Sequence, residues 1–231
     1  MKMKKIWKKL LGITLALTML LAAVPVQAAG DYVSVPSKAL HTLYAGTPAS
    51  SKNCLCSVPA KVSSLKSSNT SVATVKQVKE NWGQCIYYYP KKAGKTTVSF
   101  KYGSKTYKTV LTVLKYKNPI SSITIGNTKI SSSKFKSRNT YNLKYSTFAN
   151  KKVKVNFKLK SGWQLTEQFS WNGSEIVSFR GFQYALNGWA KTDPAKNNSN
   201  ITIKNGAGAF IMATAQNKST GQLVDIVINL K

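Results

Sequence analysis

The sequence has few of the side chains that carry catalysis: its 231 residues include one histidine, three cysteines and six acids. A serine or cysteine nucleophile needs a neighbouring base, and His41 is the one histidine that could supply it. His41 lies in the alternating stretch SKALHTLYAG, where we interpret it as an ordinary strand residue. Sugar hydrolysis needs two carboxyl groups brought together, and Glu167 and Glu175 are the closest pair of acids in the sequence. A calcium site needs several carboxylates, for which the chain has too few acids. We therefore expect no enzyme, cofactor or metal.

The three cysteines, Cys54, Cys56 and Cys85, do not make a zinc motif. Four ligands are needed, and only His41 could complete the set. In an exported chain, one disulfide between Cys85 and either Cys54 or Cys56 is expected, which leaves one thiol over. The alternative is three small buried residues that never oxidise.

Arginine and negative charge are also scarce. Only Arg138 and Arg180 are arginines among the 35 basic residues, and the formal net charge is +29. A field of this sign attracts polyanions such as wall teichoic acid, acidic glycans, anionic lipid or nucleic acid. The lack of the bidentate guanidinium argues against specific phosphate or base recognition, so we expect no specific nucleic-acid partner.

Long apolar runs are absent except near the N-terminus. The basic start MKMKKIWKKL, the apolar run LLGITLALTMLLAAVPV and the small residues of QAAG indicate a secretory signal peptide over residues 1–29. Cleavage is expected after Ala28 or Ala29, and it lowers the formal net charge to +24 by removing five lysines. We expect a secreted or wall-associated chain that is not an integral membrane protein.

Short alternating segments separated by Gly, Asn, Ser and Pro make up most of the chain from Asp31 onward. Strands at this spacing predict an all-β fold of sandwiches or barrels. The segment KNPISS near Asn118 divides them into two sandwiches, 31–116 and 117–231. The expected strands are 39–43, 54–58, 71–75, 84–89, 96–102 and 106–114, then 122–125, 141–146, 152–160, 164–171, 175–179, 183–190, 200–204, 208–216 and 223–230.

The first predicted sandwich contains three motifs in this order: LYAGT (43–47), SSLKSSNTSVATV (63–75) and KKAGKTTVSFKYGSKTYKTVLTV (91–113). In this order they resemble bacterial immunoglobulin-like domains of group 2, over residues 35–114. The usual tryptophan before the double serine is absent, with Leu65 or Lys66 near its place. Cys54, Cys56 and Val58 stand where the family has aliphatic residues. The resemblance implies a non-catalytic module of bacterial surface proteins and transfers no site residues. We expect two tandem immunoglobulin-like sandwiches, the second immunoglobulin-like or fibronectin-like.

Two groups of residues in the second sandwich are candidates for binding. Trp163, Trp171, Tyr184 and Trp189 lie near Gly or Asn, and exposed aromatic rings stack on sugars. These residues are the candidate site of a carbohydrate-binding module, against the alternative that they belong to the core.

The second group is a row of lysines in KKVKVNFKLKSGW (151–163). Lys152, Lys154, Lys158 and Lys160 alternate with apolar residues, which predicts a strand with one buried face. Because the chain is basic nearly everywhere, we interpret the row as one solvated face of a diffuse positive surface. The favoured function is therefore an exported binding or adhesion protein that associates with anionic wall or host polymers.

Overall fold

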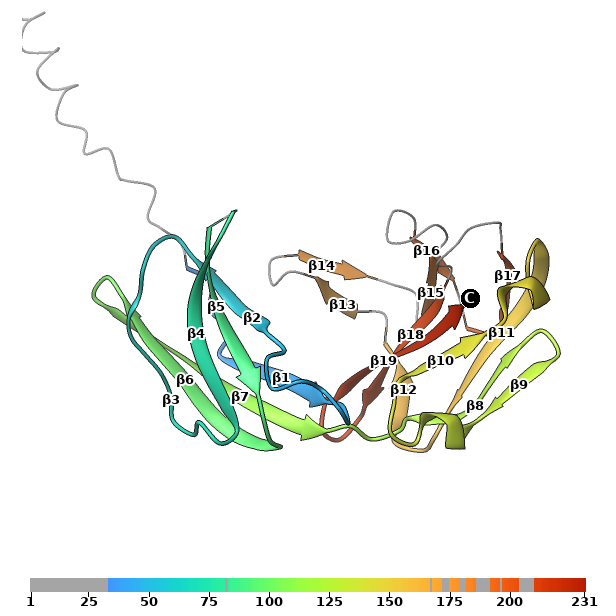
Figure 1. Ribbon diagram of the computed structural model, residues 1–231, viewed down its shortest axis with the longest axis horizontal. Coiled ribbons are helices and arrows are strands. Elements are labelled where there is room, and N and C mark those ends of the chain that lie inside the picture. The colour runs from blue at the N-terminus through green and yellow to red at the C-terminus, as the bar shows by residue number, and fades with distance from the viewer. Residues whose placement is uncertain are drawn as a thin grey trace, which may run out of the picture. The chain divides into compact units, whose positions relative to one another are not determined.

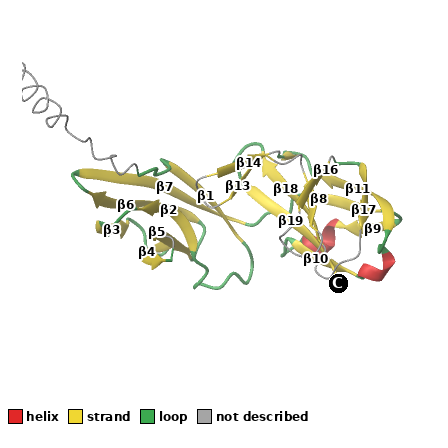
Figure 2. Cartoon of the chain, turned by 90° about the horizontal axis from the view of Figure 1, so that it is seen from above, coloured by secondary structure: helices red, strands yellow, loops and turns green. Residues whose placement is uncertain are grey.

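The structure is a computed structural model, and it describes residues 33–231 except 82, 167, 172–174, 179–181, 186–191, 196 and 204–209. The side chains of 168–171, 175–178, 182–185 and 192–195 also lie outside the description. The predicted signal peptide falls outside the described residues. Within them, no helix combines the length and apolar character needed to cross a membrane. Figure 2 shows strands almost throughout, with helical residues confined to short turns.

The first sandwich consists of two sheets (Figure 1). One sheet has the order β1 (Lys38–Leu43), β7 (Lys105–Lys115), β6 (Gly94–Tyr102) and β3 (Ser63–Ser67); the other has the order β2 (Asn53–Val58), β5 (Gly83–Pro90) and β4 (Ala73–Glu80). Strand β1 pairs in parallel with β7, and the other pairs are antiparallel. Ile86 from one sheet and Phe100 and Leu111 from the other are almost fully buried.

The second sandwich also has two main sheets. One sheet has the order β17 (Ser199–Ile203), β11 (Lys151–Leu159), β8 (Ile120–Ile125) and β9 (Thr128–Ser131); the other has the order β10 (Thr140–Leu143), β19 (Leu223–Leu230), β18 (Phe210–Asn217), β15 (Phe182–Ala185) and β16 (Thr192–Ala195), with β12 (Trp163–Leu165) also on β18. The hairpin of β13 (Gln168–Trp171) and β14 (Glu175–Ser178) pairs separately, and two 3-10 turns are η1 (Ser132–Phe135) and η2 (Tyr145–Thr147). Ile123, Val155 and Ile226 lie in the core between the main sheets.

The all-β prediction is confirmed, with differences in particular strands. The segment expected as a strand at 71–75 becomes one only at Ala73, because Val72 closes a turn by donating its N–H to the Asn69 carbonyl. Val72 is buried, whereas Val75 is only half-buried. The segment expected at 164–171 is split between β12 and β13, and the one at 141–146 ends at Leu143. Strands β3, β9 and β16 were not expected; β3 carries a single apolar residue and a bulge.

The motifs of the first sandwich contact each other. The Thr96 hydroxyl lies 2.7 Å from the Ser67 hydroxyl and accepts a hydrogen bond from the Asn69 N–H. Val72 packs on Gly94, whose φ of +155° suits glycine and where a Cβ would lie 2.7 Å from a Val72 methyl. The SSNTSVATV and AGKTT segments therefore form one interlocked unit between β3 and β6.

The segment between β7 and β8 is fixed by hydrogen bonds. The Tyr116 hydroxyl donates to the carbonyls of Phe135 and Arg138. The Asn118 side chain accepts from the Ile120 N–H and donates to the Ser132 carbonyl. The predicted joint is therefore an ordered connection that docks onto the start of the second sandwich.

Candidate anion-binding face

Strand β11 presents a row of lysines on one side and buries the other side. Val153, Val155 and Phe157 are almost fully buried, while Lys152 and Lys154, which alternate with them, are exposed. Lys158 is also exposed, as is Lys160 just beyond the end of the strand. This alternation confirms the prediction that the apolar residues face the core and the lysines face solvent.

The register of the neighbouring strands places short polar residues beside this row. Lys152 is opposite Thr202 and Lys154 opposite Asn200 on β17, while Lys158 is opposite Ser122 on β8. The members of this "lysine face" are Lys129 and Ser131 on β9, Ser122 and Thr124 on β8, Lys152, Lys154, Asn156 and Lys158 on β11 with Lys160 beyond it, and Asn200 and Thr202 on β17. These four strands contain no acid. The face is therefore uniformly positive and rich in hydrogen-bond donors.

A groove of about 750 Å³ opens at one end of the lysine face. Its lining is Gly126, Asn127, Thr128, Thr147, Phe148, Lys151, Lys152, Val153 and Lys154. The Lys151 ammonium donates to the Thr147 carbonyl at 2.8 Å, which holds it on the rim. Gly126 has a φ of +55° and allows the β8–β9 turn that brings Asn127 and Thr128 to the lysines. Asn127, Thr128 and Lys129 were not predicted as site residues, although the short TKIS alternation after a glycine is a signal for them.

The few acids do not neutralise these lysines within the described structure. Glu80 forms the one ion pair of the described residues, with Lys52 at 3.0 Å, and also accepts a hydrogen bond from Tyr87. Asp225 accepts from the Thr214 hydroxyl at 2.7 Å, and burial raises the pKa of its carboxyl. Both belong to other sheets. No acid whose side chain is described therefore forms an ion pair with a lysine of the lysine face.

His41 lies between the two sheets of the first sandwich. Its Nδ1 is 3.3 Å from the Tyr88 hydroxyl, and the two rings meet edge to face at 5.6 Å. The buried Nε2 finds no hydrogen-bond partner among the described residues, and burial lowers the pKa of the ring. A neutral imidazole packed on a tyrosine is consistent with its interpretation as an ordinary strand residue.

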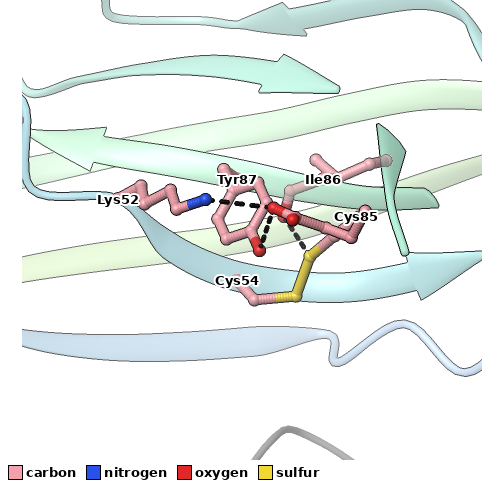
Figure 3. Close-up of a disulfide and its surroundings, with 6 residues drawn as sticks. Lys52, Cys54, Cys85, Ile86 and Tyr87 are labelled. Carbon is pink, nitrogen blue, oxygen red and sulfur yellow. Dashed lines mark hydrogen bonds and ion pairs between the residues drawn. A yellow bond between two sulfur atoms is a disulfide. The ribbon is translucent and has the colours of Figure 1, made fainter. Parts of the chain in front are cut away.

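The disulfide joins Cys54 and Cys85 on neighbouring strands of one sheet, with their Cα atoms 6.3 Å apart (Figure 3). A register shift between Cys54 and Cys56 marks a bulge in β2. After the bulge, Cys56 is opposite the core residue Ile86 and is itself buried. Burial raises the pKa of its thiol to about 11. Beside the disulfide, the Lys52 ammonium lies 4.7 Å from the centre of the Tyr87 ring.

The described structure does not test the predicted aromatic site, because the side chains of three of its four residues lie outside the description. Trp163 on β12 is half-buried and packs against the core of the second sandwich. Trp171 lies at the end of β13, and Tyr184 on β15 is paired with Ile211, but the side chains of both lie outside the description. Trp189 lies outside the described residues altogether. Carbohydrate binding by this set therefore stays a prediction.

No known family profile matches the chain, and no curated protein matches its sequence. Among solved structures it is similar to protocadherin gamma C5 EC1–3, with 10% identity, 87% of this chain and 68% of that chain covered, and a TM-score of 0.31. For protocadherin gamma B7 EC1–4 the identity is 10%, the coverage 84% and 49%, and the TM-score 0.28, so this chain spans about half of that one. For the titin domains z1z2 in complex with telethonin the identity is 12%, the coverage 86% and 94%, and the TM-score 0.24. The assignment to β-sandwiches therefore rests on the chain's own sheets.

Proposed function

We propose that the protein is an exported, non-catalytic binding or adhesion protein that associates with anionic polymers such as teichoic acid or acidic glycans. In this proposal a signal peptide over residues 1–29 directs export, and two immunoglobulin-like domains, 31–116 and 117–231, follow. The first is of the bacterial group 2 type. The protein then works at the cell surface or outside the cell, without a cofactor.

The lysine face carries this proposal. Its lysines are exposed, lie in one sheet and meet no described carboxylate, so they are free to attract an external anion. The contact between the SSNTSVATV and AGKTT segments supports the group 2 assignment, because the residues that carry the resemblance pack on each other.

Retention on purified bacterial wall material tests the proposal. The chain without residues 1–29 should bind walls at low ionic strength and be released as salt rises, because salt screens exposed charges over roughly 10 Å at 0.1 M. Walls stripped of teichoic acid, and neutral polysaccharide beads, serve as controls and should retain little protein. Undiminished retention on stripped walls at high salt would show that charge is not the basis of binding. Competition by neutral sugars would instead favour the carbohydrate-binding alternative.

A further inference from the structure

We propose that Lys152, Lys154, Lys158 and Lys160 form a track for one extended polyol-phosphate chain whose phosphates are six backbone bonds apart, as in a poly(glycerol phosphate). The inference rests on the proposed function and narrows its ligand class. It differs from a diffuse positive surface because the spacing of the charges, and not only their number, takes part in recognition.

The spacing follows from strand geometry. A strand rises about 3.3 Å per residue, so outward positions recur about every 6.6 Å. A polypeptide has three backbone bonds per residue and reaches about 3.3–3.6 Å per residue when extended, so six comparable bonds reach about 7 Å. The glycerol phosphate repeat, counted from one phosphorus to the next, has six bonds. Successive phosphates of an extended chain therefore keep pace with the outward positions of β11 from Lys152 to Lys158. Lys160 lies beyond the end of β11 and after the register shift at Lys158/Leu159, and its flexible stem absorbs this irregularity.

The residues around the row suit such a chain. Thr202 and Asn200 flank it on one side, and Ser122 and Thr124 on the other. Their hydroxyl and amide groups can donate to phosphate oxygens or pair with the hydroxyls of a polyol. The central outward position is Asn156, an uncharged amide that accepts a hydrogen bond from Asn197 at 3.3 Å. One pair of lysines thus lies on each side of a neutral position.

The groove gives the track a concave end. It lies at Lys152 and Lys154, and Asn127, Thr128 and Thr147 line it with polar groups. Its volume of about 750 Å³ is within the range of small-molecule sites, about 300–1,000 Å³. Lys151 adds a further ammonium at its rim. A terminal repeat of the chain fits this position better than the open sheet.

The chemistry of the face favours a polyol phosphate over nucleic acid. Single-stranded nucleic acids bind to aromatic stacking platforms, and the outward positions of this sheet carry none. Base reading and bidentate phosphate recognition rely on arginine, and all the basic residues of the face are lysines. A lysine acts as a point charge, which suits the single negative charge of a phosphodiester.

The test compares two variants of equal charge. The track variant carries Lys152→Gln, Lys154→Gln, Lys158→Gln and Lys160→Gln. The scattered variant carries Lys61→Gln, Lys76→Gln, Lys92→Gln and Lys105→Gln, four exposed lysines of the first sandwich. Both are made in the chain without residues 1–29, and thermal unfolding checks that each keeps its stability. Binding is measured to poly(glycerol phosphate), oligothymidylate and heparin as a function of salt.

We expect the track variant to lose about tenfold more affinity for poly(glycerol phosphate) than the scattered variant. The slope of log affinity against log salt should be shallower by about 2 to 3 in the track variant. Lysine acetylation of the unaltered protein should show protection by the polymer at the four track lysines and none at the scattered four.

Equal losses in the two variants would overturn the track while leaving charge-based attachment in place. Failure of the unaltered protein to bind any of the three polymers would overturn the proposed function as well. If oligothymidylate or heparin binds as tightly as poly(glycerol phosphate) and depends on the track lysines to the same degree, the polyol-phosphate assignment is overturned in favour of that polymer.

Discussion

Removal of the Cys54–Cys85 disulfide should destabilise the first sandwich by a calculable amount. The bond closes a loop with a sequence separation of 31. The chain-entropy relation gives a loss of about 12 cal/mol/K for such a loop, or about 3.7 kcal/mol at 25 °C. With an m-value near 2 kcal/mol/M in urea, the double variant Cys54→Ala/Cys85→Ala should unfold at a midpoint lower by about 2 M. Urea titration followed by circular dichroism measures this shift, with Cys56→Ala as the control that keeps the bond.

The bulge in β2 makes the same prediction sharper. Cys56 is opposite the core residue Ile86, whereas Cys85 is bonded to Cys54 on the other side of the strand. With Cys54→Ala alone, the remaining thiols should therefore stay separate, and alkylation in denaturant should count two of them. A variant with no free thiol and an unchanged urea midpoint would show that Cys56 replaces Cys54, and would refute this account of the register.

Three further substitutions test individual contacts. Gly94→Ala should cost about 2 kcal/mol of unfolding free energy, because its φ is +155° and a Cβ would contact Val72. A double-mutant cycle of thermal unfolding should show a smaller cost in a Val72→Ala background. Tyr116→Phe should cost about 1 kcal/mol by the same assay. Burial raises the pKa of Asp225, so its contribution to stability is present below the ordinary pKa of 3.8 and is lost as pH rises through the raised value. Asp225→Asn should remove this loss, measured as unfolding free energy against pH. If the variant still loses stability over the same pH range, Asp225 is not the group responsible.

Much of the strand pattern is readable from the sequence because a half-buried strand has a period of two residues. Val153, Val155 and Phe157 alternate with polar residues in the sequence and are buried together in β11. The YGSK turn at 102–105 is also found between β6 and β7. These features depend on local chemistry, namely side-chain alternation and the conformational freedom of glycine at a turn.

The partner of Cys85 could not be predicted in this way. Cys54 and Cys56 are two residues apart, and a regular strand would place both on the same face. The bulge between them reverses this relation, so that one is bonded to Cys85 and the other is buried opposite Ile86. Bulges are set by the pairing of a strand with its neighbour, and the β5 residues that pair with β2 lie about 30 positions away in the sequence. Local alternation therefore left two pairings open, and the register selects one.

The lysine face raises the same difficulty in a stronger form. Lysine is so abundant that a row of four carries little information in the sequence, and its charge alone supports only a diffuse field. What distinguishes this row lies on other strands: Asn200 and Thr202 come from β17, and Ser122 and Thr124 from β8. The groove is completed by Asn127 and Thr128 in the turn after β8. In a uniformly basic chain, therefore, the neutral polar residues that the sheet register gathers around a row of lysines are a better basis for proposing a binding site than the lysines themselves.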